Sequence, residues 1–287
     1  MELVPSPRDR RLGLLLLGSS HVMNTFQVRP FSNSIEAALV SLSLVLLCKM
    51  TPTLEKASYT PDLKFLHPYL YQSYFVHLLA VIFVIGIFTR PTFLIFGAPI
   101  AYQVALRTIT SAETATRWLQ LVVPPLFTAA ATCVALIAVD TLYFRGILDN
   151  LVVTPLNFVK YNFSFHNLAD HGLHPRWLHV FVNLPMLIGP CVLWLAVRAI
   201  MEPTNLFAGK KGEVDVISRG RGLEGQCSQL LMFYLPAVII HMIVVSLTVL
   251  SVQPHQEPRF LVPLVLPIIV LITNTGRLAR VSRTFWV

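Results

Sequence analysis

The chain has 287 residues, of which 55% are hydrophobic and only 13% are charged. Soluble domains carry about 25% charged residues, and the apolar residues are gathered here into runs of the roughly 17–25 residues that a transmembrane helix needs. This composition excludes an ordinary water-soluble domain. The net charge of +8 does not indicate a nucleic-acid partner, because the basic residues of a membrane protein lie in its loops and set its topology. We expect an all-α, multi-pass membrane protein surrounded by membrane lipids.

Apolar segments follow one another along the whole chain and predict a single membrane domain, 1–287, with about eight transmembrane or re-entrant helices. The predicted segments are Leu12–Val28, Ser34–Met50, Gln72–Phe88, Pro91–Leu106, Trp118–Leu142, Trp177–Ile200, Ser228–Val252 and Arg259–Thr275. The second, fourth and last are short. If the fourth is re-entrant rather than spanning, the orientation of every segment before it is reversed.

The distribution of basic residues predicts that both termini face the cytoplasm. In that orientation 16 of the 22 Lys and Arg residues are cytoplasmic, in agreement with the positive-inside rule. The loops 143–176 and 253–258 are then luminal, and the Gly- and charge-rich loop 201–226 is cytoplasmic. The sequence "NFS" at Asn162 is an N-glycosylation acceptor motif, which is used only on the luminal side, and it agrees with this orientation.

The stretch "HNLADHGLHPRWLH", which joins loop 143–176 to the predicted span Trp177–Ile200, is rich in histidine. Its histidines are His166, His171, His174 and His179. A helical zinc site would place two histidines at i and i+4, whereas the gaps here are 5, 3 and 5, and Gly172 and Pro175 interrupt any helix. We therefore expect no metal. Two roles stay open for these side chains, as luminal hydrogen-bond donors or as contacts for a substrate.

A second polar cluster, "HQEPRFLVP", lies at the mouth of the last predicted span and contains His255, Glu257 and Arg259. An arginine at this place is either an interface residue whose charge reaches the headgroups or a phosphate ligand, since a guanidinium matches phosphate oxygens bidentately. Glu257 would either orient Arg259 or act in acid/base chemistry. Arg29 and Arg90, each followed by proline, are expected only to mark the ends of spans.

Five short stretches of the sequence resemble, in the same order, motifs of the dolichyl-phosphate-mannose-dependent mannosyltransferases of glycosyltransferase family 22. They are "RPFSNSIEAAL" (Arg29–Leu39), "FTRPTF" (Phe88–Phe93), "VVTPLNFVKYN" (Val152–Asn162), "HGLHPRWLHVFVNLPMLIGP" (His171–Pro190) and "HQEPRFLVP" (His255–Pro263). The resemblance is greatest to the branch of the family that adds the fourth, side-branch mannose of the GPI anchor.

This resemblance implies that the chain is the C-terminal part of a GT-C fold in the endoplasmic reticulum membrane. It implies transfer of an α-1,2-linked mannose from dolichyl phosphate mannose to the third mannose of the GPI-anchor precursor on the luminal side, with no cofactor besides the lipid-linked donor. The donor phosphate or sugar would be contacted by His255, Glu257 and Arg259. The luminal wall of the cavity would be formed by His171, His174, Arg176 and Trp177.

One family feature is missing from the sequence. Family members carry a luminal loop with an acidic pair, the expected catalytic base, before the "RPFSNS" motif. The base is therefore unassigned, and we expect this chain by itself to be weakly active or inactive. Two other functions stay open. One is an inactive truncated isoform or regulatory membrane subunit of the same pathway. The other is a lipid or solute transporter, for which intramembrane charges and repeated halves are expected but not seen.

Overall fold

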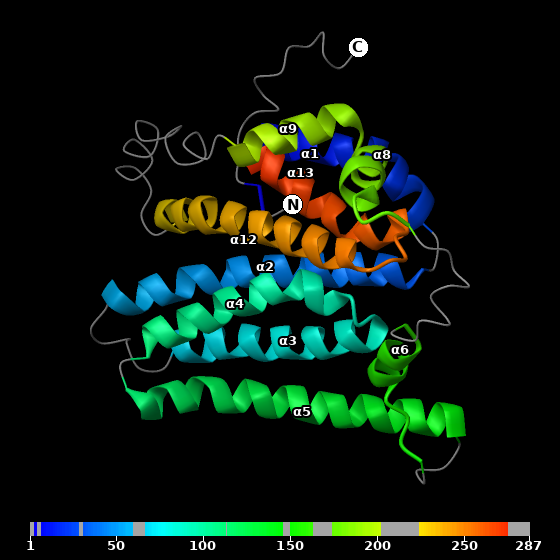
Figure 1. The fold of residues 1–287 in the computed structure, drawn as a ribbon. Coiled ribbons are helices and arrows are strands. Elements are labelled where there is room, and N and C mark those ends of the chain that lie inside the picture. Colours follow the sequence, from blue (N-terminus) through cyan, green and yellow to red (C-terminus); the bar gives the residue numbers. More distant parts are fainter. Residues whose placement is uncertain are drawn as a thin grey trace.

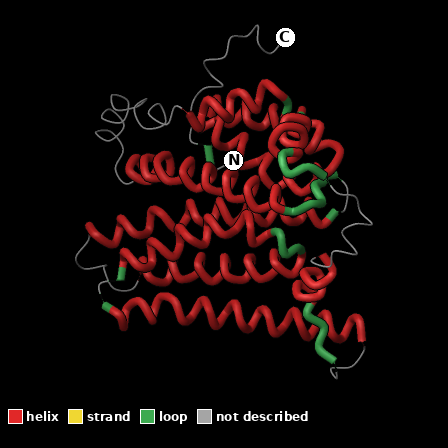
Figure 2. The backbone as a smooth tube through the Cα atoms, in the orientation of Figure 1, coloured by secondary structure: helices red, strands yellow, loops and turns green. Residues whose placement is uncertain are grey.

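The structure is a computed structural model that describes residues 3–4, 7–28, 31–59, 67–112, 114–145, 150–162, 174–201 and 224–274. Every regular element in these ranges is a helix (Figures 1 and 2). This confirms the predicted all-α class.

The helices follow the apolar segments of the sequence. In chain order they are α1 (Pro7–Ser19), η1 (Met23–Gln27), α2 (Ser32–Tyr59), α3 (His67–Thr89), α4 (Phe93–Ser111), α5 (Ala115–Arg145), α6 (Thr154–Asn162), η2 (His179–Asn183), α8 (Leu184–Ile188), α9 (Pro190–Met201), α12 (Glu224–Val252), η3 (Pro258–Leu264) and α13 (Val265–Asn274).

The centre of the protein is built from long helices that lie side by side. Helix α2 contacts α3, α4, α12 and the short helix η3 (Figure 1). Helix α5 packs on α3 at one edge, and α1, α9 and α13 gather at the opposite edge. The core between them is apolar and includes the fully buried Leu44, Met242 and Leu271. The short helix η3 packs against α2 in this central part of the molecule.

Helix α5 has the most exposed apolar surface. None of the residues in its most apolar 18-residue window is buried within the protein, and Phe127 and Val134 are largely exposed. A continuous apolar face of this size is unfavourable in water and suits lipid tails. The helix is joined to α3 by a hydrogen bond of 2.6 Å between His77 Nδ1 and Thr128 Oγ1.

The described residues contain three helical stretches that are long and apolar enough to cross a membrane, and four if one bent pair is counted as a span. The three are Ser32–Met50, Ala115–Arg145 and Leu235–Val252, and the bent pair is His179–Ile188 with Pro190–Met201. Shorter apolar helices occupy Tyr74–Thr89, Phe93–Ile109 and Pro258–Asn274. The protein is thus a multi-helical membrane protein.

The predicted span Leu12–Val28 is not one uninterrupted helix. The helix stops at Ser20, between α1 and η1. Side-chain hydrogen bonds explain the break, because Asn24 Nδ2 donates to the carbonyl of Gly18 (3.2 Å) and Ser19 Oγ donates to that of Leu16 (3.3 Å). Such local bonds compete with the regular helical ladder.

The predicted span Trp177–Ile200 is also not one straight helix. The chain bends by 115° between α8 and α9. Gly189 at the bend has a φ of 80°, which glycine adopts without strain, and Pro190 after it has no N–H to continue the ladder. The loop predicted at 201–226 falls largely outside the described residues, and the loop predicted at 143–176 is described except for residues 146–149 and 163–173.

Candidate functional site

The segment between α12 and η3 carries the first three residues of the "HQEPRF" motif, 255–257, and the last three begin η3. Glu257 has φ −99° and ψ 141°, as expected of a residue before proline, which disfavours helical geometry at the preceding position. Pro258 then starts η3 at a position where its missing N–H is not needed. Because neighbouring side chains in an extended segment point to opposite sides, His255 and Glu257 share one side and Gln256 takes the other.

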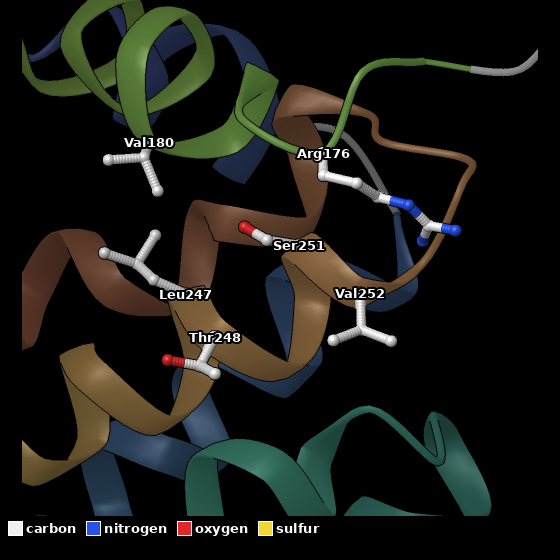
Figure 3. A pocket seen from close by; sticks show the side chains of 6 residues that line it. All are labelled: Arg176, Val180, Leu247, Thr248, Ser251 and Val252. Atoms are coloured by element: carbon white, nitrogen blue, oxygen red, sulfur yellow. The ribbon is translucent and has the colours of Figure 1, made fainter.

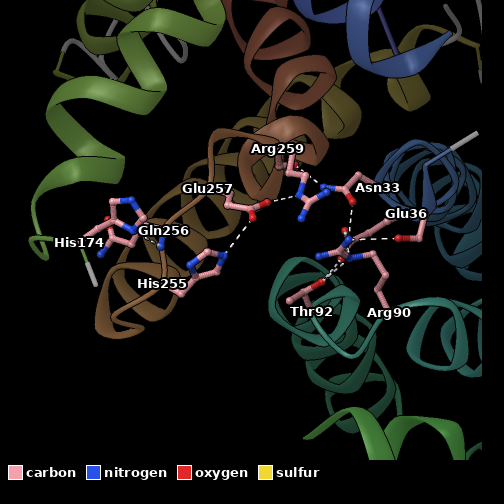
Figure 4. A network of polar contacts seen from close by, with 10 residues as sticks. Asn33, Glu36, Arg90, Thr92, His174, His255, Gln256, Glu257 and Arg259 are labelled. Carbon is pink, nitrogen blue, oxygen red and sulfur yellow. Dashed lines mark hydrogen bonds and ion pairs between the residues drawn. The ribbon is translucent and has the colours of Figure 1, made fainter. Parts of the chain in front are cut away.

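The three residues predicted to contact the donor lie together (Figure 4). His255 Nε2 is 3.0 Å from Glu257 Oε1, and Arg259 Nε is ion-paired with Glu257 Oε2. Burial alone would raise the pKa of Glu257, but hydrogen bonds from His255 and Arg259 and the charge of Arg259 bring the pKa below its ordinary value. Glu257 is therefore a carboxylate at neutral pH, and its geometry is that of a partner that orients Arg259.

Glu257 and Arg259 line a pocket of about 470 Å³. Its lining residues are His21, Thr25, Phe26, Phe31, Glu257, Pro258 and Arg259. The π-helix η1 contributes Thr25 and Phe26 to it, and helices of this kind are frequent at functional sites. The sequence pattern did not single out His21 or Thr25, because both fall in a stretch that was predicted to be part of a span. The polar residues in "HVMNTFQ" were the feature of the sequence that could have indicated a pocket there.

Gln256 holds the motif in place from its other side. It is buried, with 1% of its surface exposed. Its Nε2 donates to the carbonyls of Ser251 (3.1 Å), Gln253 (3.2 Å) and Arg176 (3.3 Å), while its Oε1 accepts from the His179 N–H (3.0 Å). A buried amide satisfied in this way fixes its surroundings strongly. The "HQEPRF" segment is thereby attached to the segment that leads into η2.

The residues predicted to form the luminal wall are placed differently from one another. The His174 ring lies 5.8 Å from that of His255, centroid to centroid, and the main-chain N–H of His174 donates to the Pro254 carbonyl (2.8 Å). Arg176 instead lines a second pocket of about 460 Å³ (Figure 3). Trp177 is 54% exposed. His171 and His166, and the side chain of Asn162, lie outside the described residues.

The second pocket is mostly apolar. It is lined by Arg176, Val180, Leu247, Thr248, Ser251 and Val252. It lies on the Gln256 side of the motif, since Gln256 donates to the carbonyls of both Arg176 and Ser251.

A buried polar network next to the first pocket was missed by the sequence analysis, which assigned Arg90 only to the end of a span. Arg90 is 9% exposed and lies at the corner between α3 and α4. Its guanidinium donates to Ser32 Oγ (3.1 Å), Thr92 Oγ1 (3.2 Å) and Asn33 Oδ1 and pairs with Glu36 Oε2 at 3.3 Å (Figure 4). Thr92 Oγ1 also donates to Glu36 Oε1 (2.6 Å).

Within the described part of the chain, no group of three or more His, Cys, Asp and Glu side chains could hold a metal ion. The cationic groups near the first pocket are guanidinium groups, which bind phosphate oxygens well.

Comparison with known proteins finds relatives that are all named as GPI mannosyltransferases. GPI mannosyltransferase 4 of Drosophila melanogaster is 33% identical over 90% of this chain and 39% of its own length. GPI mannosyltransferase 4 of Emericella nidulans is 32% identical over 92% of this chain and 41% of its own length. GPI alpha-1,2-mannosyltransferase 4 of Homo sapiens is 32% identical over 93% of this chain and 44% of its own length.

The chain thus spans about two fifths of the length of these curated relatives. No solved structure matches it. The model of the Alg9-like mannosyltransferase family matches residues 8–284, nearly the whole chain. The chain therefore belongs to the Alg9-like mannosyltransferase family.

Proposed function

We propose that this protein is a glycosyltransferase of GPI-anchor biosynthesis. It transfers an α-1,2-linked mannose from dolichyl phosphate mannose to the third mannose of the GPI precursor glycolipid. Family membership and the names of the three relatives support this activity. The proposal includes the finer architecture expected from the sequence: a GT-C fold with about eight spans in the endoplasmic reticulum membrane and a site on the luminal side.

The observation that carries the proposal is the cluster of His255, Glu257 and Arg259 at the wall of the first pocket. In the reaction, the acceptor hydroxyl oxygen bonds to the anomeric carbon of the donor mannose while the bond from that carbon to the phosphate oxygen breaks. The bonding electrons leave with dolichyl phosphate. A positive group held beside the departing phosphate stabilises the charge that develops there.

Arg259 is the residue that we assign to the departing phosphate. Its side chain is 44% exposed, and the ion pair with Glu257 restricts the orientation of its guanidinium. His255 supports Glu257 from the other side at 3.0 Å. Phe26 and Phe31 give the same pocket apolar walls, which suit the lipid-linked end of the donor. The base that accepts the hydroxyl proton remains unassigned.

No metal or other cofactor is needed in this scheme. Positive charge is supplied by arginine, and the leaving group is already a phosphate. We accordingly expect a chelator to leave mannosyl transfer unchanged.

A chimera tests the proposal. This chain would replace the matched segment of the Emericella nidulans relative, and the chimera would be expressed in cells that lack the fourth GPI mannose. We expect the fourth mannose to be restored, and we expect Arg259→Ala and Glu257→Gln to lower transfer without loss of expression. An exposed arginine on α5, Arg145, provides the control Arg145→Ala. Normal transfer by both site variants would refute the donor-site assignment.

Expression of the chain by itself separates two outcomes of the same test. Restoration of the fourth mannose by the 287-residue chain would refute the expectation that it is weakly active alone. If neither the chain nor the chimera restores the mannose although both are expressed, the proposed activity is wrong and a regulatory role in the pathway becomes the alternative to test.

A further inference from the structure

The corner between α3 and α4 is connected to the proposed donor site through one side chain, Asn33. The two ends of its amide have different partners. Oδ1 accepts a hydrogen bond from Arg90, and Nδ2 donates to the main-chain carbonyl of Arg259 at 2.6 Å. Asn33 is 3% exposed, so water does not compete for either bond. An amide is suited to such a link because it has a donor and an acceptor on one rigid plane.

A second contact joins the same two places. The Arg90 guanidinium carbon lies 5.4 Å from the centroid of the Phe260 ring, within the range of a cation–π interaction. Arg90 thus contacts the residue after Arg259 directly and reaches Arg259 itself through Asn33. Both connections act on the first turn of η3, where the main chain leaves the "HQEPRF" motif.

The charges of the corner and of the pocket also act on each other. Burial lowers the pKa of Arg90 below its ordinary value, and Glu36 opposes this effect. Arg259 lowers the same pKa further, whereas Glu257 raises it. The guanidinium groups of Arg90 and Arg259 and the carboxylates of Glu36 and Glu257 therefore interact electrostatically, although they come from three different parts of the chain.

We propose that Arg90 is a positioning residue that, through Asn33 and Phe260, holds the main chain of Arg259 so that its guanidinium faces the donor phosphate. This inference rests on the proposed function for the identity of the ligand. Arg90 itself needs no contact with the donor. Its ion pair with Glu36 keeps the buried guanidinium charged and fixed, which is the condition for holding Asn33 in one orientation.

The test measures binding and local order in the purified chain in detergent. Dolichyl phosphate is the ligand, and dolichol, which lacks the phosphate, is the control lipid. Asn33→Asp keeps the acceptor for Arg90 but removes the donor to the Arg259 carbonyl, so it cuts the link while leaving the Arg90–Glu36 pair in place. Arg90→Gln removes the guanidinium that donates to Asn33 Oδ1. Asn157→Asp, on the exposed surface of α6, is the matched control.

We expect Asn33→Asp and Arg90→Gln to weaken dolichyl phosphate binding on the order of tenfold or more, because small misplacements of a binding group have effects of this size. A change of net charge alone would also weaken anion binding. Therefore each variant is repeated in the Arg259→Ala background, where an effect through Arg259 disappears and a long-range charge effect persists. Hydrogen–deuterium exchange of residues 257–264 should be faster in both variants and unchanged in Asn157→Asp.

The outcomes separate this inference from the proposed function. Wild-type binding and wild-type exchange in both variants would overturn the inference, and so would a loss of affinity that persists without Arg259. If the wild-type chain binds dolichol as well as dolichyl phosphate, the donor-site proposal fails. The positioning of Arg259 is then judged by exchange alone, and unchanged exchange in Asn33→Asp and Arg90→Gln overturns it.

Discussion

Substituting Gly86 by alanine perturbs the packing of the α3–α4 corner that presents Arg90. A Cβ on Gly86 would lie 2.5 Å from both Cγ and Cδ1 of Phe93, whereas ordinary contact begins at 3.4 Å. The ring would have to withdraw by about 0.9 Å. Phe93 is fully buried, and its ring already meets that of Phe83 edge-on, with 5.4 Å between centroids. The first ring therefore cannot withdraw without moving the second.

The expected cost follows from two opposing effects. Overpacking a buried site costs about 1–3 kcal/mol, and the upper half of this range applies because the clash involves Cγ of Phe93, the inner end of its ring. Alanine regains about 1 kcal/mol over glycine in a helix. The net destabilisation is about 1–2 kcal/mol, which corresponds to a fall in melting temperature of roughly 2–6 °C.

Thermal unfolding of the purified chain in detergent measures this effect. The control is Gly18→Ala in α1, where no atom lies within 4 Å of the new Cβ and the melting temperature should stay constant or rise. In a Phe93→Ala background the methyl group of Gly86→Ala enters vacated space and should no longer destabilise. An equal fall in melting temperature in both backgrounds would refute the ring clash as the cause.

Three further predictions concern the site and the topology. The lowered pKa of Glu257 means that its ion pair stabilises the fold above the ordinary value of 4.5 and that this contribution is lost as the pH falls below it. The difference in melting temperature between the wild type and Glu257→Gln should therefore shrink as the pH falls below 4.5; a difference that stays the same from pH 5 down to pH 3 would contradict this sign. Gln256→Ala should destabilise the chain by about 1–3 kcal/mol, since it leaves the buried main-chain N–H of His179 without its acceptor. Gln253→Ala keeps the main-chain carbonyl that accepts from Gln256 and should cost less in the same unfolding assay. If loop 143–176 is luminal, the chain expressed in microsomes should lose mass on treatment with a glycosidase specific for N-glycans, and Asn162→Gln should abolish the shift; an unglycosylated wild type would remove this support for the orientation.

Local features of the site could be predicted from the sequence because they depend on neighbours along the chain. His255, Glu257 and Arg259 follow one another at intervals of two residues, and the proline between the last two disfavours helical geometry at Glu257. The apolar runs likewise predicted the positions of the long helices, since helix length and hydrophobicity are properties of a segment. The bend at Gly189 also had a local signal in the sequence Gly-Pro.

The Arg90 network could not be predicted in this way. Arg90 and Asn33 are 57 residues apart, and Asn33 and Arg259 are 226 apart. Their contacts arise only when α2, the α3–α4 corner and η3 pack together. An arginine before a proline at the end of an apolar run is typical of a span boundary, and its burial becomes visible only in the folded protein.

The alternation of side chains in residues 255–257 has a consequence for what this loop tolerates. Its length determines which groups meet the protein interior and which meet the pocket. Inserting or deleting one residue before Glu257 would exchange the two sides, so that a carboxylate would enter the space that Gln256 fills and the amide would face the pocket. A substitution changes the contacts of one residue, but a change of length disrupts the contacts on the pocket side and on the Gln256 side together.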